Sequence, residues 1–151
     1  MLRARIDDAL KTAMKSQKKH TVATIRLIMA ALKDRDIAAR SEGNMDGISD
    51  DEILSMLQSM IKQRRESVEM YEKGGRAELA EQEAGEIVII ETFLPEQMDE
   101  TAVRGAIDEA ISEIGAASLK DMGKVMGILK GRFAGQMNFS KASAGVKARL
   151  T

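Results

Sequence analysis

Apolar residues recur at helical spacing along almost the whole chain. A period near 3.6 residues is typical of amphipathic helices, whereas a half-buried strand shows strict alternation. The pattern predicts an all-α fold, with an N-terminal bundle of about four helices followed by a smaller three-helix C-terminal domain. Only the run Glu86–Ile90, with four consecutive apolar residues, fits a strand as well as a buried helix turn. The apolar stripes begin at Leu2, Val22, Ile53, Leu79, Val103, Leu119 and Val146.

Capping and turn residues indicate where the first helices begin and end. Thr21 is predicted to cap the second helix. Residues 41–48 hold two glycines, an Asn and an Asp, which is typical of a loop. Ser49 followed three residues later by Glu52 forms a capping box for the third helix. The pair Gly74 and Gly75 then predicts the end of that helix.

The single proline indicates a boundary between two parts of the chain. Proline disfavours helical backbone in the residue before it, so Pro95 ends the fourth helix. The polar stretch from Pro95 to Asp99 separates this helix from the next apolar stripe. We therefore predict an N-terminal helical domain at residues 1–95 and a three-helix domain at residues 96–151.

The overall charge of −1 conceals a strongly uneven distribution. Residues 1–40 hold ten Lys and Arg against four Asp and Glu, and residues 41–113 hold six against nineteen. Residues 114–151 hold seven against Asp121 alone. A basic end favours a partner of negative charge, although solvated helix faces give the same pattern.

Composition excludes several kinds of catalytic and binding site. The chain has no cysteine, so it has neither thiol nucleophiles nor thiolate-bound zinc, and His20 is its single histidine. We assign His20 a solvated or capping role. No Gly-rich phosphate loop is present, so we assign no catalytic residue, metal site or cofactor. The scarcity of aromatic residues, at 3%, argues against stacking of single-stranded nucleic acid.

Two charged clusters in the middle of the chain have ordinary explanations. The basic run Lys62–Arg65 precedes Glu66 and Glu69, which predicts a solvated helix face with pairs four residues apart. The four glutamates between Glu78 and Glu86 scatter around their helix and do not form a cation site. No run of about 18 apolar residues exists, so no membrane partner is expected. The absence of cysteine and of an apolar leader favours a cytoplasmic location.

The sixth predicted helix, about Leu119 to Lys130, has two distinct faces. One arc is apolar, and the opposite arc combines lysine with glycine. Each glycine inside a helix costs about 1 kcal/mol relative to alanine, so three of them indicate that something approaches the backbone closely. A phosphate backbone, another helix, or fraying at Gly131 would each account for them. The second arc consists of Lys120, Gly123, Lys124, Gly127, Lys130 and Gly131.

Further cations follow this helix and favour an anionic partner. Recognition would use shape and backbone charge, as for structured RNA, and no DNA partner is expected. The candidate nucleic-acid-binding residues are Lys120, Gly123, Lys124, Gly127, Lys130, Arg132, Lys141, Lys147 and Arg149.

Five segments along the chain carry a resemblance to a known family: Leu27–Lys33, Lys62–Ser67, Tyr71–Arg76, Phe93–Glu96 and Asp121–Met126. In this order they resemble the GatB/YqeY family over almost the whole chain. Relatives in this family include the tail of the B subunit of the glutamine-dependent tRNA amidotransferase. The resemblance implies contact with the tRNA body, and it falls best on Gly123, Lys124, Met126 and Gly127. Phe133 and Asn138 depart from the Ala and the small or apolar residue common in the family.

The resemblance implies a non-catalytic tRNA-binding module. The chain lacks the amidase and phosphorylating parts of the amidotransferase, so the family label of a carbon–nitrogen ligase with glutamine as amido donor describes its relatives. Implied partners are tRNA and possible tRNA synthetase or amidotransferase components. The alternative is a protein-interaction adaptor that docks a partner helix on the arc of lysines and glycines of the sixth helix, which we call the Lys/Gly face. A stand-alone amidotransferase has the least support.

Overall fold

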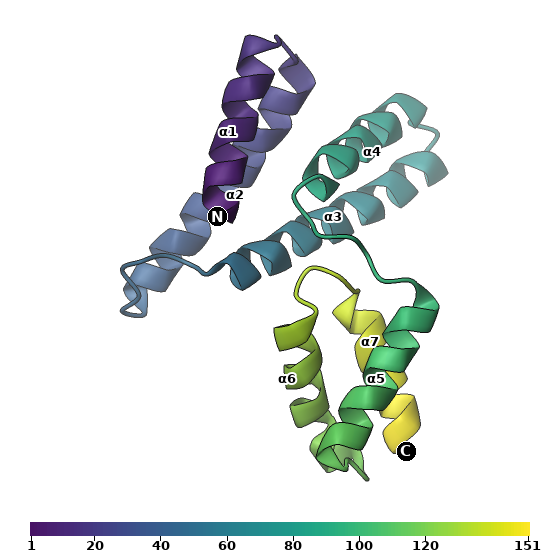
Figure 1. Cartoon of the computed structure of the whole chain (residues 1–151). Helices are drawn as coiled ribbons and strands as arrows, with labels where there is room; N and C mark the ends of the chain where they lie inside the picture. The colour runs from purple at the N-terminus through teal and green to yellow at the C-terminus, as the bar shows by residue number, and fades with distance from the viewer. The chain divides into compact units, whose positions relative to one another are not determined.

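Every regular element of the protein is a helix. The computed structural model describes all 151 residues. The segment Glu86–Ile90 lies inside a helix, and the all-α prediction is confirmed. The elements are α1 (Leu2–Lys15), α2 (Lys19–Ser41), α3 (Asp50–Lys73), α4 (Ala77–Glu91), α5 (Glu100–Ile114), the short 3₁₀ helix η1 (Leu119–Asp121), α6 (Met122–Arg132) and α7 (Phe139–Leu150) (Figure 1).

The chain divides into two compact units with separate hydrophobic cores. The first unit, Met1–Leu94, contains α1 to α4, and the second, Pro95–Thr151, contains α5 to α7. Each buried cluster draws its residues from one unit only. The assignment of independent domains at residues 1–95 and 96–151 stays a prediction, because compactness alone does not show that a unit folds by itself.

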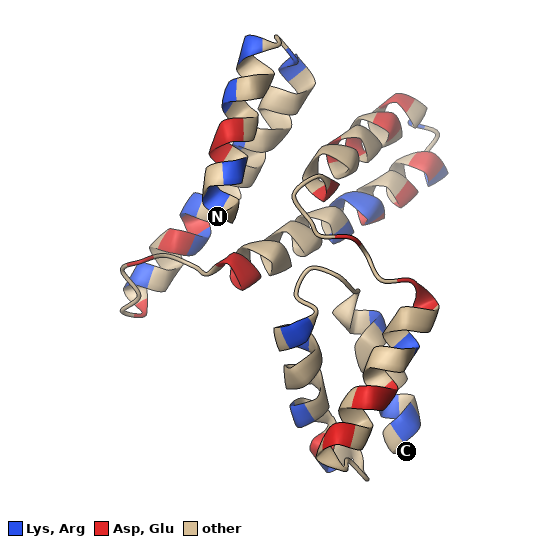
Figure 2. Ribbon diagram, in the orientation of Figure 1, with Lys and Arg blue, Asp and Glu red and all other residues tan.

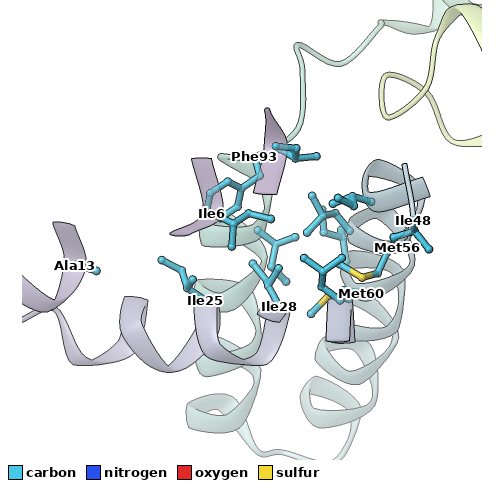
Figure 3. Close-up of a cluster of buried hydrophobic side chains, with 14 residues drawn as sticks. Ile6, Ala13, Ile25, Ile28, Ile48, Met56, Met60 and Phe93 are labelled. Atoms are coloured by element: carbon cyan, nitrogen blue, oxygen red, sulfur yellow. The ribbon is translucent and has the colours of Figure 1, made fainter. Parts of the chain in front are cut away.

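The core of the first unit combines one apolar stripe from each of its helices. Ile6 of α1 and Ile28 of α2 are at most 1% exposed, and Phe93 closes the cluster after α4 (Figure 3). Complete burial of such side chains contributes about 1.5–3 kcal/mol each. The stripes read from the sequence are therefore the faces that hold this unit together. Its fully buried members are Ile6, Ile25, Ile28, Ile53, Met56, Leu57 and Ile90.

The predicted helix ends in this unit are correct at α3 and wrong at the start of α2 and the end of α4. Helix α4 ends at Glu91, four residues before Pro95, so the proline does not terminate it directly. Both hydrogen bonds of the Ser49 and Glu52 capping box are present. The helix that they open ends at Lys73, and Gly75 then adopts a left-handed conformation with φ +72°. The prediction that Thr21 caps α2 is wrong, because α2 begins two residues earlier at Lys19. The tight turn after α1 leaves no extended residue near Thr21 to act as a cap.

A partly buried hydrogen-bond network anchors the loop between α2 and α3. Arg3 of α1 donates to both carboxylate oxygens of Asp36 on α2, at 2.7 and 2.8 Å. The same guanidinium donates to the carbonyl oxygen of Ile48, and the Ile48 N–H donates to Asp36 Oδ1. The hydrogen bonds from Arg3 lower the pKa of Asp36 to about 2. One ion pair thus joins two helices and the predicted loop at residues 41–48.

The second unit packs three helices around a smaller core. Asp99 caps α5 by accepting a hydrogen bond from the Ala102 N–H at 2.7 Å. Asn138 caps α7 by accepting from the Ser140 and Lys141 N–H groups. Asn138, one of the two residues that depart from the family pattern, is therefore the N-cap of α7. Core residues of this unit include Ala106, Ile107, Ala110, Val125, Leu129, Met137, Ala142, Val146 and Leu150.

The predicted sixth helix differs from the observed one at both ends. Leu119–Asp121 form a 3₁₀ turn, and the α-helix proper runs from Met122 to Arg132. Leu119 is consequently 46% exposed and does not extend the apolar face. The helix passes through Gly131, so fraying does not explain that glycine. None of the seven α-helices combines the length and the apolar character needed to cross a membrane.

Candidate nucleic-acid interface

The buried face of α6 fixes the direction in which its opposite face points. Val125 and Leu129 are fully buried, and Met122 and Met126 are partly buried against the same core. These four side chains lie within about 120° of one another around the helix axis. The Lys/Gly arc predicted from the sequence therefore faces away from the core of the second unit.

The Lys/Gly face of α6 is uncovered within its own unit. Lys120, Lys124 and Lys130 are exposed, as are the three glycines between and beside them. A Cβ atom added at Gly123, Gly127 or Gly131 would meet no atom within 4 Å. Packing of α5 or α7 against the glycines is thus excluded as the reason for their presence.

The two arginines among the candidate residues are engaged in ion pairs with α5. Arg132 Nη2 donates to Glu113 Oε1 at 2.6 Å, and this hydrogen bond lowers the pKa of Glu113. Arg149 donates through Nε to Asp108 and through Nη1 to the carbonyl oxygen of Gly145. A phosphate group would have to compete with these carboxylates for either guanidinium.

The five candidate lysines form no ion pair inside the protein. Lys120, Lys124 and Lys130 extend from η1 and α6, and Lys141 and Lys147 extend from α7. All five are exposed. The seven candidate cations therefore form two groups, five lysines free to bind a ligand and two arginines paired with acids.

The lysines of α7 do not lie on a single line. Lys141 and Lys147 are six residues apart, which places them about 120° apart around a helix axis. They flank the buried stripe of Ala142, Val146 and Leu150 on opposite sides. Lys124 and Lys130 of α6 are also six residues apart, and they flank the row of glycines on that helix from its two sides. The structure thus does not gather all nine candidates at one point.

The acidic helix α5 limits the basic surface of the second unit. This helix holds four acids against Arg104, and it shares a core with α6 and α7. Figure 2 shows acidic positions along α5 and only basic charged positions on α6 and α7. The acids of α5 were counted with the acidic segment 41–113, so their proximity to the basic helices α6 and α7 was not predicted. The four acids are Glu100, Asp108, Glu109 and Glu113.

The partners of the arginines could not be read from local spacing. Glu113 precedes Arg132 by 19 residues, and Asp108 precedes Arg149 by 41. The one feature of Glu113 and Asp108 that the sequence shows is their position beside the apolar stripe of α5. Such pairs depend on how the helices cross.

The other charged clusters also pair across helices. Arg64 Nε donates to Glu86 Oε2 at 2.9 Å, and Arg65 donates to Glu91 at 3.2 Å. The prediction of pairs with Glu66 and Glu69 along the same helix is wrong, because α4 supplies the nearer carboxylates. His20 is exposed in the first turn of α2.

The chain matches one family model over nearly its full length. That model, described as a YqeY-like protein, aligns with residues 3–150.

Relatives in fungi support the same grouping. An uncharacterized protein of Schizosaccharomyces pombe is 30% identical over 95 residues, which cover 63% of this chain and 73% of that protein. A protein of Pyrenophora tritici-repentis named "Altered inheritance of mitochondria protein 41, mitochondrial" is 28% identical over 85% of this chain and 71% of its own length. A protein of the same name from Lachancea thermotolerans is 32% identical over 60% of this chain and 46% of its own. Because this family model covers residues 3–150, the chain belongs to the YqeY-like protein family.

Proposed function

We propose that this protein is a non-catalytic RNA-binding module that holds tRNA by its phosphate backbone. The observation that carries the proposal is the Lys/Gly face of α6, which is exposed, free of acids and uncovered by α5 or α7. Lysine ammonium groups neutralise phosphates without reading bases. Glycines without side chains let a phosphate backbone approach the helix axis closely.

The interface we propose is centred on α6 rather than spread evenly over the basic tail. Lys124 and Lys130 flank the glycines of α6, and Lys120 precedes them in η1. All three are exposed and unpaired, so they contribute most. Lys141 and Lys147 contribute from the flanks, and the paired Arg132 and Arg149 contribute least. The resemblance to the amidotransferase tail supports tRNA as the RNA class and its body as the part contacted.

The test is a fluorescence anisotropy titration of labelled total tRNA at about 50 and 200 mM salt. We expect the double variant Lys124→Ala/Lys130→Ala to lower the slope of log affinity against log salt by about 2. The matched control is Lys62→Ala/Lys73→Ala, which removes two exposed lysines of α3. An equal slope for both double variants would refute the interface.

A second function is favoured by the glycine spacing itself. Glycines four residues apart also let a partner helix approach α6 closely, so a protein-interaction adaptor is the alternative. Binding to a tRNA synthetase or amidotransferase component that survives nuclease treatment and varies little with salt would support the adaptor. Such a result, with no affinity for tRNA, would replace the RNA proposal.

We also propose that the chain has no amidotransferase activity by itself. It lacks cysteine and a phosphate-binding loop, and Glu86 and Glu91 of its acidic helix α4 pair with arginines in the manner of structural ion pairs. Glutaminase activity of the purified protein, abolished by one substitution, would overturn this view. A cytoplasmic location stays a prediction, and two relatives are named for mitochondria.

The two compact units are proposed to be independent domains of four and three helices. Gln97 Nε2 donates to the Gly135 carbonyl oxygen and the Met98 N–H donates to that of Gln136, so the second unit includes residues 97 and 98. Residues 95–151 expressed alone should give a helical circular dichroism spectrum and a cooperative thermal transition. A non-cooperative or unfolded fragment would contradict the domain assignment.

A further inference from the structure

A second basic surface lies in the first unit, outside the interface proposed above. No acid occurs between Asp8 and Asp34, whereas the same stretch contains six Lys and Arg and the single histidine. The C-terminal half of α1, the turn after it and the first half of α2 together make up this stretch. The basic residues are Lys11, Lys15, Lys18, Lys19, Arg26 and Lys33.

The turn between the two helices gathers its lysines at one end of the first unit. Only residues 16–18 separate Lys15, the last residue of α1, from Lys19, the first residue of α2. Every residue from 14 to 20 is exposed, and no lysine of this segment forms an ion pair. Figure 2 shows only basic charged positions at this end of α1 and α2. We call residues 11–20 the hairpin tip.

Backbone hydrogen bonds close the turn inside the hairpin tip. The Lys18 N–H donates to the carbonyl oxygen of Ala13 at 3.0 Å, and the Gln17 N–H donates to that of Met14 at 3.2 Å. This double pattern is the Schellman motif, with Gln17 in the left-handed conformation at φ 56°. The lysines are therefore presented from a fixed turn, which limits the entropy that binding would cost.

The chemistry of the hairpin tip fits a phosphate backbone better than a membrane surface. Insertion into a lipid interface needs several exposed apolar side chains, whereas the tip exposes one large apolar residue, Met14. It also has no Phe, Tyr or Trp for stacking on bases, and its one imidazole is that of His20. Unpaired lysines on a rigid turn suit non-specific contact with successive phosphates.

We propose that the hairpin tip is a second RNA-binding surface, which contacts phosphates independently of the α6 face. A protein with two such surfaces holds one RNA more tightly than either surface alone, because the second contact is intramolecular.

The test compares two double variants of the full chain in the tRNA titration. Lys15→Gln/Lys19→Gln removes two charges from the tip, and Lys62→Gln/Lys73→Gln removes two exposed charges from α3 of the same unit. We expect the tip variant to lower the salt slope by about 2. Wild type would then lose about tenfold more affinity than the variant between about 50 and 200 mM salt. The α3 control should match wild type, and circular dichroism should show equal helix content in all three proteins.

Three outcomes would overturn the proposal. The tip variant could match the α3 control, or wild-type protein could fail to bind RNA at low salt. The tip variant could also lose binding to phosphatidylserine vesicles while it keeps its affinity for RNA, which would assign the tip to lipid headgroups. Failure of the α6 interface is seen separately, because Lys124→Ala/Lys130→Ala would then leave the salt slope unchanged while the tip variant lowers it.

Discussion

Arg132 of α6 donates a 2.6 Å hydrogen bond to Glu113 of α5, and both side chains are about half exposed. The pair links the basic helix of the second unit to its acidic neighbour. The guanidinium and carboxylate stabilise each other's charged forms, which lowers the pKa of Glu113 and raises that of Arg132. A cation that is already partly neutralised attracts phosphates less than the unpaired Lys124 on the same helix.

Replacement of Glu113 tests whether this pair restrains RNA binding. We expect Glu113→Gln to raise tRNA affinity at low salt and to steepen the salt slope by up to about 1, because Arg132 is released for a phosphate. Glu96→Gln is the matched control, since it removes an exposed acid of the second unit that forms no ion pair. An equal effect of both variants would show that only the net charge matters.

The same pair predicts an order among the alanine variants. Lys124→Ala should lower the salt slope by about 1, and Arg132→Ala should lower it by less. An equal decrease in salt slope for the two variants would mean that the RNA displaces Glu113 completely from Arg132.

The glycines of α6 allow stability and binding to be separated. Gly127→Ala adds a Cβ atom that meets nothing within 4 Å, so it should raise the free energy of unfolding by about 1 kcal/mol. If a phosphate backbone lies against this glycine, the same methyl group should weaken tRNA binding. Gly105→Ala in the exposed middle of α5 is the control, with a similar gain in stability and no loss of affinity. Unchanged tRNA binding by Gly127→Ala would remove the close-approach argument.

The helices could be predicted from the sequence because each buries one apolar stripe of regular period. Ile28 and Ile53 are core residues for that reason alone. The capping box at Ser49 is equally local, since its two partners are three residues apart. Thr21 misled the prediction because a cap requires an extended residue at a free helix end, and the turn before α2 supplies that end at Lys18.

The parts of the candidate site that could not be predicted depend on contacts between helices. The Lys/Gly arc follows from the spacing within α6, whereas the pairing of Arg132 with Glu113 depends on how α5 and α6 pack. Leu119 fits the α-helical wheel, yet the 3₁₀ turn changes its direction and leaves it exposed. The left-handed conformation of Gln17 could not be predicted from its residue type, because the turn between α1 and α2 imposes it.

The conformation of Gln17 predicts a stabilising substitution. A residue with a Cβ atom pays about 1 kcal/mol for left-handed backbone, and glycine does not. We therefore expect Gln17→Gly to raise the free energy of unfolding in urea by about 1 kcal/mol. Ser16→Gly is the control, because Ser16 has ordinary helical angles and glycine should destabilise it. A loss of stability in Gln17→Gly would show that its side chain makes a contact worth more than the strain.

The loop before α3 depends on a glycine beside the Arg3–Asp36 pair. A Cβ atom at Gly47 would lie 2.7 Å from both Arg3 Nη2 and Asp36 Oδ1, and the residue has φ +86°. Gly43 has a similar φ of +94° with no atom near its Cβ position. We expect Gly43→Ala to cost about 1 kcal/mol from backbone strain alone, and Gly47→Ala to cost more because it also disrupts the ion pair. If urea denaturation shows equal losses of unfolding free energy for both variants, the Arg3–Asp36 hydrogen bonds rearrange around the added methyl group without destabilising the protein.

The Arg3–Asp36 pair also predicts how stability depends on pH. The folded pKa of Asp36, about 2, is below its ordinary value of 3.8, so folding favours the ionised carboxylate. Its contribution is fully present above the ordinary value and is lost as the pH falls from about 4 to about 2. Since Arg3 is 38% exposed, water screens the pair, and we expect a contribution of about 1 kcal/mol.

Urea denaturation near neutral pH should show Asp36→Asn less stable than wild type, and this difference in unfolding free energy should close toward about pH 2. Asp8→Asn removes an exposed carboxylate without an ion pair, and it should change stability little at either pH. A gap for Asp36→Asn that persists at low pH would assign its cost to lost hydrogen-bond geometry instead of lost charge.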